Sequence, residues 1–416
     1  MKSENPKDQP GNGVDGESYV DTWNSEPFDA YRRFRSKGKV AWDPGLKAWI
    51  TTDYNVCRHV FRTDKKAFRK LTEQVADHYW YEILGDRDVM FLDGEDHTRY
   101  HRYWVSFFSP KVVDAWRAPK IRPIIDATID HFEARGRADL FSDLAEQISP
   151  RVIMSVCGLP WDGDELFDRC MQLVRTRMAW NQIREQAPNA TIAEGAVQSI
   201  HALKEMVDPI IAERQQNPTG DDLISSVWRD GSRLFADWDA TDTFYTLAFM
   251  LFAGSETTAY TISSALYVLA THPSLQSTLG AGGNEAIENF TEEALRLFGS
   301  TAFVARLSNE DVELGDVHLK KDERIFALTG AANRDPSRWP SPETVDLQHA
   351  SHDHLAFSLG PHTCAGAALA RAEIQETVAA VLRRLPGLRM DPASAGPQYV
   401  GSRIRGYRPV NVVFGG

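Results

Sequence analysis

Hydrophobic residues recur at intervals of three to five positions over most of the chain, which is the spacing of one buried face of a helix. This pattern predicts helices over residues 112–135, 140–157, 195–215, 239–271 and 285–297. Short strand-like runs occur at 39–42 and 48–52, joined through a turn at 43–45, and again at 312–319 and 410–414. The sequence therefore predicts a mainly α fold with small peripheral β-sheets.

The sequence shows no linker, repeat or low-complexity tract that would divide the chain. Residues 1–18 are rich in Lys, Asp, Pro and Gly, which is typical of a mobile tail. We therefore expect one large domain over residues 19–416.

Charge and cysteine content narrow the classes of function. The net charge of −12 disfavours nucleic acid as a partner, because phosphate binding needs a basic face. Cys57, Cys157, Cys170 and Cys364 are scattered without a CxxC pair, which argues against a zinc site or a disulfide framework. The most apolar stretch, 244–254, is too short to span a bilayer, and the polar N-terminus shows no signal peptide. These features predict a soluble, cytoplasmic protein that binds neither nucleic acid nor a membrane.

Cys364 lies where a loop rich in glycine runs into a helical pattern. The free N–H groups and the dipole at a helix N-terminus stabilise a thiolate over a thiol. Gly360 and Gly366 lack Cβ, so the backbone can approach a flat ligand closely. The pattern indicates a metal-binding thiolate, and a buried structural cysteine is the alternative.

The run from Phe357 to Gly366 resembles the haem-binding loop of the cytochrome P-450 family, whose bacterial pattern is Phe-Gly-x-Gly-x-His-x-Cys-x-Gly. Phe357, Gly360, His362, Cys364 and Gly366 match this pattern, whereas Ser358 replaces its first glycine. The resemblance implies heme b (iron protoporphyrin IX) with Cys364 as the ligand of the iron and the other four matching residues in the cofactor site. It also implies the family's triangular, helix-rich fold, and it covers nearly the whole chain from Pro27 onward.

The longest predicted helix contains Ala253-Gly254-Ser255-Glu256-Thr257, which resembles the family's Ala-Gly-x-acid-Thr segment on the distal face of the haem. By this resemblance Gly254 leaves room for a diatomic ligand, Thr257 hydrogen-bonds dioxygen or water, and Glu256 feeds protons to the distal side. Reductive O–O cleavage needs protons on one side, which suits a carboxylate beside a hydroxyl. The alternative is that Gly254 and Thr257 only allow close packing and a mild bend, with Glu256 in solvent.

Glu293 and Arg296 stand three positions apart on one helix face, and they resemble the family's buried Glu-x-x-Arg pair. In the family a further arginine completes this pair. Here that position is His349, which cannot make the bidentate fork of a guanidinium. We therefore expect a network that is weaker or more sensitive to pH.

Two haem propionates need cationic or hydrogen-bonding partners. The resemblance assigns this role to His97, Arg306 and His354. The family's arginine one helical turn after the first of these is replaced by His101, and Arg102 is the less favoured alternative.

The resemblance places substrate contacts in residues 75–91, 171–193, 301–304 and 400–405 and in the long helix. These segments are aromatic, with His78, Tyr79, Trp80, Tyr81, Phe91, Trp180, Phe244, Phe249 and Phe303. Such a lining suits a compact apolar or aromatic ligand, although aromatic residues are equally common core fillers. Arg184, Arg403 and Arg405 can instead anchor a carboxylate, so the sequence leaves neutral and acidic substrates open.

We expect a haem–thiolate monooxygenase that inserts one oxygen atom from dioxygen into a C–H bond of a small hydrophobic substrate, by hydroxylation or O-dealkylation. No flavin or iron–sulfur domain is visible, so we expect electrons from a separate ferredoxin and ferredoxin reductase, which dock on a basic rim of Arg99, Arg102, Lys111 and Arg371. We further expect a monomer. The alternatives are a hydrogen-peroxide-driven peroxygenase, a non-catalytic haem–thiolate sensor or binding protein, and a helical binding protein without haem.

Overall fold

The computed structural model describes residues 16–62, 66–70, 78–90, 92–183 and 189–415. Its α-helices are α1 (Phe28–Ser36), α2 (Tyr54–Arg62), α4 (His78–Leu84), α5 (Gly94–Phe107), α6 (Pro110–Trp116), α7 (Arg122–Asp130), α8 (Glu146–Cys157), α9 (Asp164–Ile183), α10 (Ala190–Gln216), α11 (Leu223–Leu234), α12 (Ala240–Thr271), α13 (Pro273–Phe298), α14 (Thr329–Ala332) and α15 (Ala367–Arg384). The predicted predominance of helices is confirmed.

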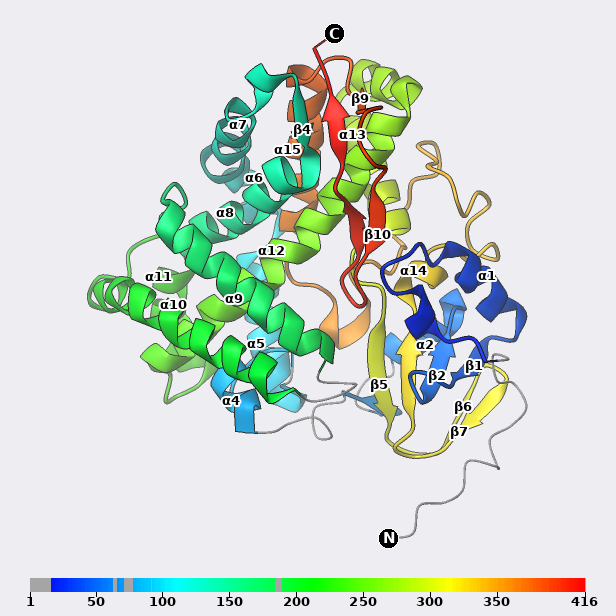
Figure 1. Cartoon of the computed structure of the whole chain (residues 1–416). Helices are drawn as coiled ribbons and strands as arrows, with labels where there is room; N and C mark the ends of the chain where they lie inside the picture. The colour runs from blue at the N-terminus through cyan, green and yellow to red at the C-terminus, as the bar shows by residue number, and fades with distance from the viewer. Residues whose placement is uncertain (1–15, 63–65, 71–77, 91, 184–188, 416) are drawn as a thin grey trace.

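The strands form small sheets, and the largest of them lies beside the helical body at the lower right of Figure 1. The largest sheet has the order β1-β2-β8-β5-β3 and contains β1 (Val40–Asp43), β2 (Ala48–Thr51), β3 (Phe68–Arg69), β5 (Val304–Ser308) and β8 (Arg324–Ala327). Smaller sheets pair β6 (Val312–Leu314) with β7 (Val317–Leu319), β10 (Gln398–Val400) with β11 (Gly406–Arg408), and β12 (Asn411–Val413) with both β4 (Arg137–Asp139) and β9 (Arg389–Met390). The strand pair around the turn at 43–45 is therefore confirmed.

Helix α12 crosses the middle of the helical body, and its most extensive packing is against α8 (Figure 1). It begins where the sequence predicted, because the Asp239 side chain accepts from the backbone N–H groups of Thr241 and Asp242 and so caps the first turn. A Cβ on Gly254 would lie 3.0–3.3 Å from atoms of the Ile153 side chain in α8. Glycine at this position therefore lets the two helices approach closely.

Four predicted helices differ from the structure in extent. The pattern at 140–157 is a π-helical turn at Leu140–Ala145 followed by α8, and the pattern at 195–215 lies inside the longer α10. The pattern at 112–135 is divided into α6, a π-helical turn at Arg117–Ile121, α7 and a 3-10 turn at Glu133–Arg135. The π turn contains Pro119, which has no N–H to donate to an α-helical ladder. The pattern at 285–297 is the second half of α13, which begins at Pro273 and bends at Gly283, where φ is +61°.

Within the described part of the chain, no helix is both long enough and apolar enough to cross a lipid bilayer.

Candidate functional site

Cys364 lies two residues before α15, whose N-cap is Gly366. It is an exposed residue, whereas Cys57, Cys157 and Cys170 are buried, so the alternative of a buried structural cysteine fails for Cys364. Desolvation by the surrounding protein nevertheless raises the pKa of its thiol, although the Gly366 N–H and the charge of Arg371 act in the opposite direction. The helix N-terminus alone therefore does not stabilise the thiolate enough to offset this desolvation. A coordinating metal ion is what deprotonates such a thiol.

The backbone of the Cys364 loop is fixed by two residues with positive φ. Gly360 has φ +75°, and a Cβ there would lie 2.5 Å from the Phe61 carbonyl oxygen. Ser358 has φ +59°, in the left-handed region that favours glycine. This explains why the family pattern has glycine at that position. The buried Ser358 hydroxyl also has no hydrogen-bond partner among the residues that the structure describes.

Three of the histidines assigned to the cofactor lie together beside the Cys364 loop. The His97 ring centroid is 3.9 Å from that of His362 and 5.2 Å from that of His101. The His101 Nε2 atom lies 2.7 Å from the Thr363 carbonyl oxygen. Burial lowers the pKa of His101, opposed by that hydrogen bond, so His101 is a weaker partner for an anion than the arginine it replaces. An exposed thiol beside a group of imidazoles fits a metal–thiolate cofactor that carries acidic groups.

His354 is hydrogen-bonded within the protein, and its expected role at a propionate stays a prediction. Its Nε2 atom lies 3.1 Å from Glu292 Oε2, and its Nδ1 atom accepts from the Ala356 N–H. Glu292 also accepts two hydrogen bonds from Arg371, at 2.7 and 2.9 Å. Burial alone would raise the pKa of Glu292, but the bonds from His354 and Arg371 outweigh it and lower this pKa to about 2. Both ring nitrogens of His354 are thus used inside the protein.

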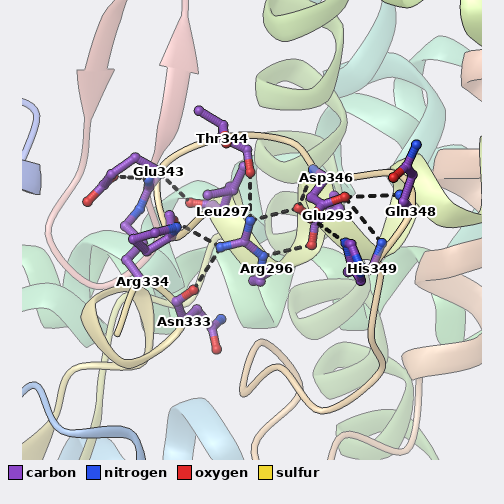
Figure 2. Close-up of polar contacts among 11 residues, drawn as sticks. Glu293, Arg296, Leu297, Asn333, Arg334, Glu343, Thr344, Asp346, Gln348 and His349 are labelled. Atoms are coloured by element: carbon purple, nitrogen blue, oxygen red, sulfur yellow. Dashed lines mark hydrogen bonds and ion pairs between the residues drawn. The ribbon is translucent and has the colours of Figure 1, made fainter. Parts of the chain in front are cut away.

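The Glu293–Arg296 pair is buried, with both side chains 2% exposed. Figure 2 shows the Arg296 guanidinium held by Glu293 on one side and by backbone carbonyls on the other. Nε and Nη2 each donate to a Glu293 oxygen at 2.7 Å. The remaining donors bond the carbonyl oxygens of Asn333, Pro342 and Thr344. Every N–H of this guanidinium therefore has an acceptor.

His349 takes no direct part in this pair. Its side chain is 74% exposed, and its Nδ1 atom lies 2.9 Å from Asp346 Oδ2 (Figure 2). It acts on the pair only through Asp346, whose backbone N–H donates to Glu293 Oε2. The expectation that His349 weakens the network is therefore revised, because backbone carbonyls supply acceptors for all the donors of Arg296.

The distal segment lies inside α12. The Thr257 hydroxyl donates to the Ala253 carbonyl oxygen at 2.7 Å. Burial raises the pKa of Glu256 to about 7, and the negative charge of Glu146 adds to this effect, while Arg408 and Arg175 oppose it. Glu256 is thus not an ordinary solvated carboxylate. Gly254 contacts α8, so the structure gives it a packing role, and its role beside a diatomic ligand stays a prediction.

The aromatic residues expected around a substrate divide into two groups. Phe249 and the exposed Tyr81 line a cavity of about 240 Å³ between α4, the loop that follows it, Tyr100 of α5 and the first half of α12. Phe303 and Phe244 are core residues, as the alternative reading held. Residues 75–77, Phe91, Arg184 and the side chain of His78 lie outside the described residues.

Two of the three arginines proposed for a carboxylate substrate, Arg403 and Arg405, lie in the described residues and contact other groups. Arg405 is fully buried and donates to the carbonyl oxygens of Thr22 and Ser25. Arg403 lies over the Phe303 ring. A different buried arginine, Arg177, forms an ion pair with Asp88 at 2.7 Å. Because these two residues are far apart in the sequence, no local pattern could have revealed the pair.

Known proteins are similar to this chain over most of its length. The sequence model of the cytochrome P450 family matches residues 41–386. The chain is 30% identical to the nocardicin C N-oxygenase of Nocardia uniformis subsp. tsuyamanensis over 372 residues, which is 87% of this chain and 88% of the relative. It is also 30% identical to the mycinamicin IV hydroxylase/epoxidase of Micromonospora griseorubida over 400 residues, 94% of each chain.

Two solved structures also superpose on this chain over most of its length. The crystal structure of CalO2 superposes with a TM-score of 0.84 at 25% identity, covering 95% of this chain and 97% of that one. A myxobacterial cytochrome P450 in complex with myristic acid superposes with a TM-score of 0.81 at 26% identity, covering 95% and 98%. The chain therefore belongs to the cytochrome P450 family of oxidoreductases, which use heme b as their cofactor.

Proposed function

We propose that this enzyme inserts one oxygen atom from dioxygen into a C–H bond of a small hydrophobic substrate, by hydroxylation or, where the carbon bears an alkoxy oxygen, by O-dealkylation. The observation that carries the proposal is the carboxyl–hydroxyl pair Glu256 and Thr257 on α12. The named relatives include an N-oxygenase and a hydroxylase/epoxidase, which supports oxygen transfer without fixing one substrate.

Heme b, when bound, activates dioxygen and transfers the oxygen atom. Cys364 is proposed as the ligand of the iron, and Phe357, Gly360, His362 and Gly366 as the residues that shape the loop around it. His97 and His101, with Arg306 on β5, are proposed as partners of the propionates. The same role is proposed for His354, whose ring nitrogens are bonded to Glu292 and Ala356 in the structure.

Glu256 is suited to deliver protons because its pKa of about 7 leaves it partly protonated at neutral pH. The Thr257 hydroxyl donates a hydrogen bond to the Ala253 carbonyl oxygen. The lone pairs of the hydroxyl oxygen can therefore accept a hydrogen bond from water or from Glu256. Gly254 keeps α12 close to α8 and thereby fixes where this pair stands.

We further propose that a ferredoxin, reduced by its reductase, supplies the electrons and that the enzyme acts as a cytoplasmic monomer. The basic rim expected for docking is smaller than the sequence suggested. Arg99 is paired with Asp96, and Arg371 is bound to Glu292. Arg102 and Lys111 are exposed, so these two carry the docking proposal.

The test compares product formed with electrons consumed, in the holoenzyme supplied with a surrogate ferredoxin, its reductase and isotopically labelled dioxygen. We expect Glu256→Gln and Thr257→Ala to consume electrons while forming much less labelled product, since a positioned acid contributes about 100-fold or more in rate. Glu288→Gln, at an exposed position of α13, is the control. Unchanged coupling in both distal variants, or product formed only with added hydrogen peroxide, would overturn the proposal in favour of the peroxide-driven alternative.

A further inference from the structure

Arg177 on α9 and Asp88 in the loop before α5 form an ion pair in which both side chains are 2% exposed. Arg177 Nη2 donates to Asp88 Oδ2 at 2.7 Å, and Asp88 Oδ1 accepts from the Met90 N–H at 2.9 Å. The Asp88 carboxylate is thus fixed at both oxygens, and it reaches the guanidinium through one nitrogen only.

The Arg177 guanidinium has donors to spare. Asp88 is its one hydrogen-bonding partner among the residues that the structure describes. A guanidinium presents five N–H groups, so its bond to Asp88 leaves donors that a further acceptor can use. Carboxylates bind a guanidinium in bidentate fashion along its Nε/Nη2 edge or its Nη1/Nη2 edge. Asp88 takes one of the two Nη2 hydrogens, so one of these two edges is left for a second carboxylate.

The Arg177 guanidinium lies near two aromatic rings that precede the distal segment of α12. The Arg177 guanidinium carbon lies 4.4 Å from the ring centroid of Phe252 and 5.8 Å from that of Phe249. Phe252 directly precedes Ala253 in α12. Phe249 stands one helical turn before Ala253, on the same face of that helix. Asp88 and Phe249 also line the cavity of about 240 Å³.

We propose that Arg177 binds the carboxylate of an acidic substrate whose apolar body lies along Phe249 and Phe252, and that Asp88 holds the guanidinium ready in the meantime. This inference rests on the proposed function and narrows its substrate class to hydrophobic carboxylic acids. Arg177 becomes a specificity-determining residue, in place of Arg403 and Arg405.

The charges around the cavity offer such a substrate few other cationic partners, and Arg177 is joined to the cavity wall through its bond to Asp88. Asp86 and Asp242 also line it, and Arg87 is already paired with Asp237 and Asp242. An anion that enters this region without a guanidinium partner meets mainly negative charge. Burial raises the pKa of Asp88, against the opposing charge of Arg177, so Asp88 can take up a proton when a second carboxylate shares the guanidinium.

The test measures dissociation constants of matched ligands by the spin-state change of the ferric holoenzyme and by calorimetry. Dodecanoic acid is compared with methyl dodecanoate, and 4-isopropylbenzoic acid with its methyl ester. We expect each acid to bind about tenfold or more tightly than its ester, which corresponds to one charge-assisted pair. Arg177→Met is expected to reduce this ratio to about one, and Arg177→Lys to keep part of it, since an ammonium retains the charge but not the fork.

Two further variants separate ligand binding from a merely structural role. Arg169→Gln changes an exposed arginine on the same helix and is expected to leave the acid-to-ester ratio unchanged. Asp88→Asn removes the competing carboxylate and is expected to raise the ratio. The same ratio in wild type, Arg177→Met and Asp88→Asn would overturn the inference. A high ratio in an enzyme that forms no oxygenated product would instead retain the inference and reject the proposed function.

Discussion

Two arginines with the same exposure are used in opposite ways. The side chains of Arg296 and Arg177 are each 2% exposed, and each pairs with one carboxylate. Arg296 has an acceptor for every N–H, from Glu293 and three backbone carbonyls (Figure 2). Arg177 has one partner among the described residues. A fully satisfied guanidinium holds a fold together, whereas one with spare donors can receive a ligand.

The two regions also differ in the pKa of a carboxyl group. Glu292, near the Cys364 loop, is held by Arg371 and His354, which overcome the effect of burial and lower its pKa to about 2. Burial raises the pKa of Glu256, in the distal segment, to about 7. The proximal side therefore keeps its charges fixed over the physiological pH range, and the distal side keeps a group that exchanges protons within it.

The largest effect is expected from replacing Arg296, whose N–H groups all have acceptors. We expect Arg296→Met to lower the free energy of unfolding by about 3–5 kcal/mol, because Glu293 is left as an unpaired buried charge. Chemical unfolding and the haem content of the purified protein would measure the loss. Arg338→Met is the control, since its ion pair with Asp353 is solvent-exposed and is expected to contribute less than about 1 kcal/mol. Equal losses in both variants would contradict the contrast.

A smaller effect is expected from Glu256→Gln, and it depends on pH. Because the folded pKa is raised, the folded state binds more protons than the unfolded state between the ordinary glutamate pKa and about 7, so wild-type stability falls as pH rises through that window. The glutamine variant lacks this loss. Its advantage is expected to grow from near zero at about pH 4 to about 3 kcal/mol at about pH 8. An advantage that does not change with pH would show that Glu256 titrates normally.

The smallest effect concerns the Cys364 loop. Ser358→Gly is expected to stabilise the protein by about 1 kcal/mol, because it relieves a positive φ and removes a buried hydroxyl without a partner. Ser109→Gly, at φ −62°, is expected to destabilise slightly through the entropy of the unfolded chain. Thermal unfolding would distinguish the two. Destabilisation by Ser358→Gly would mean that the hydroxyl has a role at the haem.

The sequence predicts those features that depend on residues close together in the chain. The start of α12 after Asp239, the glycine loop before α15 and the Glu293–Arg296 pair each depend on residues close together in the chain. Partners distant in the sequence could not be predicted from local patterns. Glu292 with Arg371, and Arg177 with Asp88, are brought together only by the packing of separate elements. For the same reason the sequence could not reveal the contact of His354 with Glu292.

The central claim is that Cys364, in the loop near the Glu292–Arg371 ion pair, ligates the haem iron. The most direct measurement is the absorption spectrum of the reduced protein with carbon monoxide, for wild type, Cys364→Ser and Cys170→Ala. We predict the thiolate-ligand absorption in wild type and Cys170→Ala, since Cys170 is buried away from this loop, and its loss in Cys364→Ser. A Cys364→Ser protein with the wild-type spectrum would contradict the account.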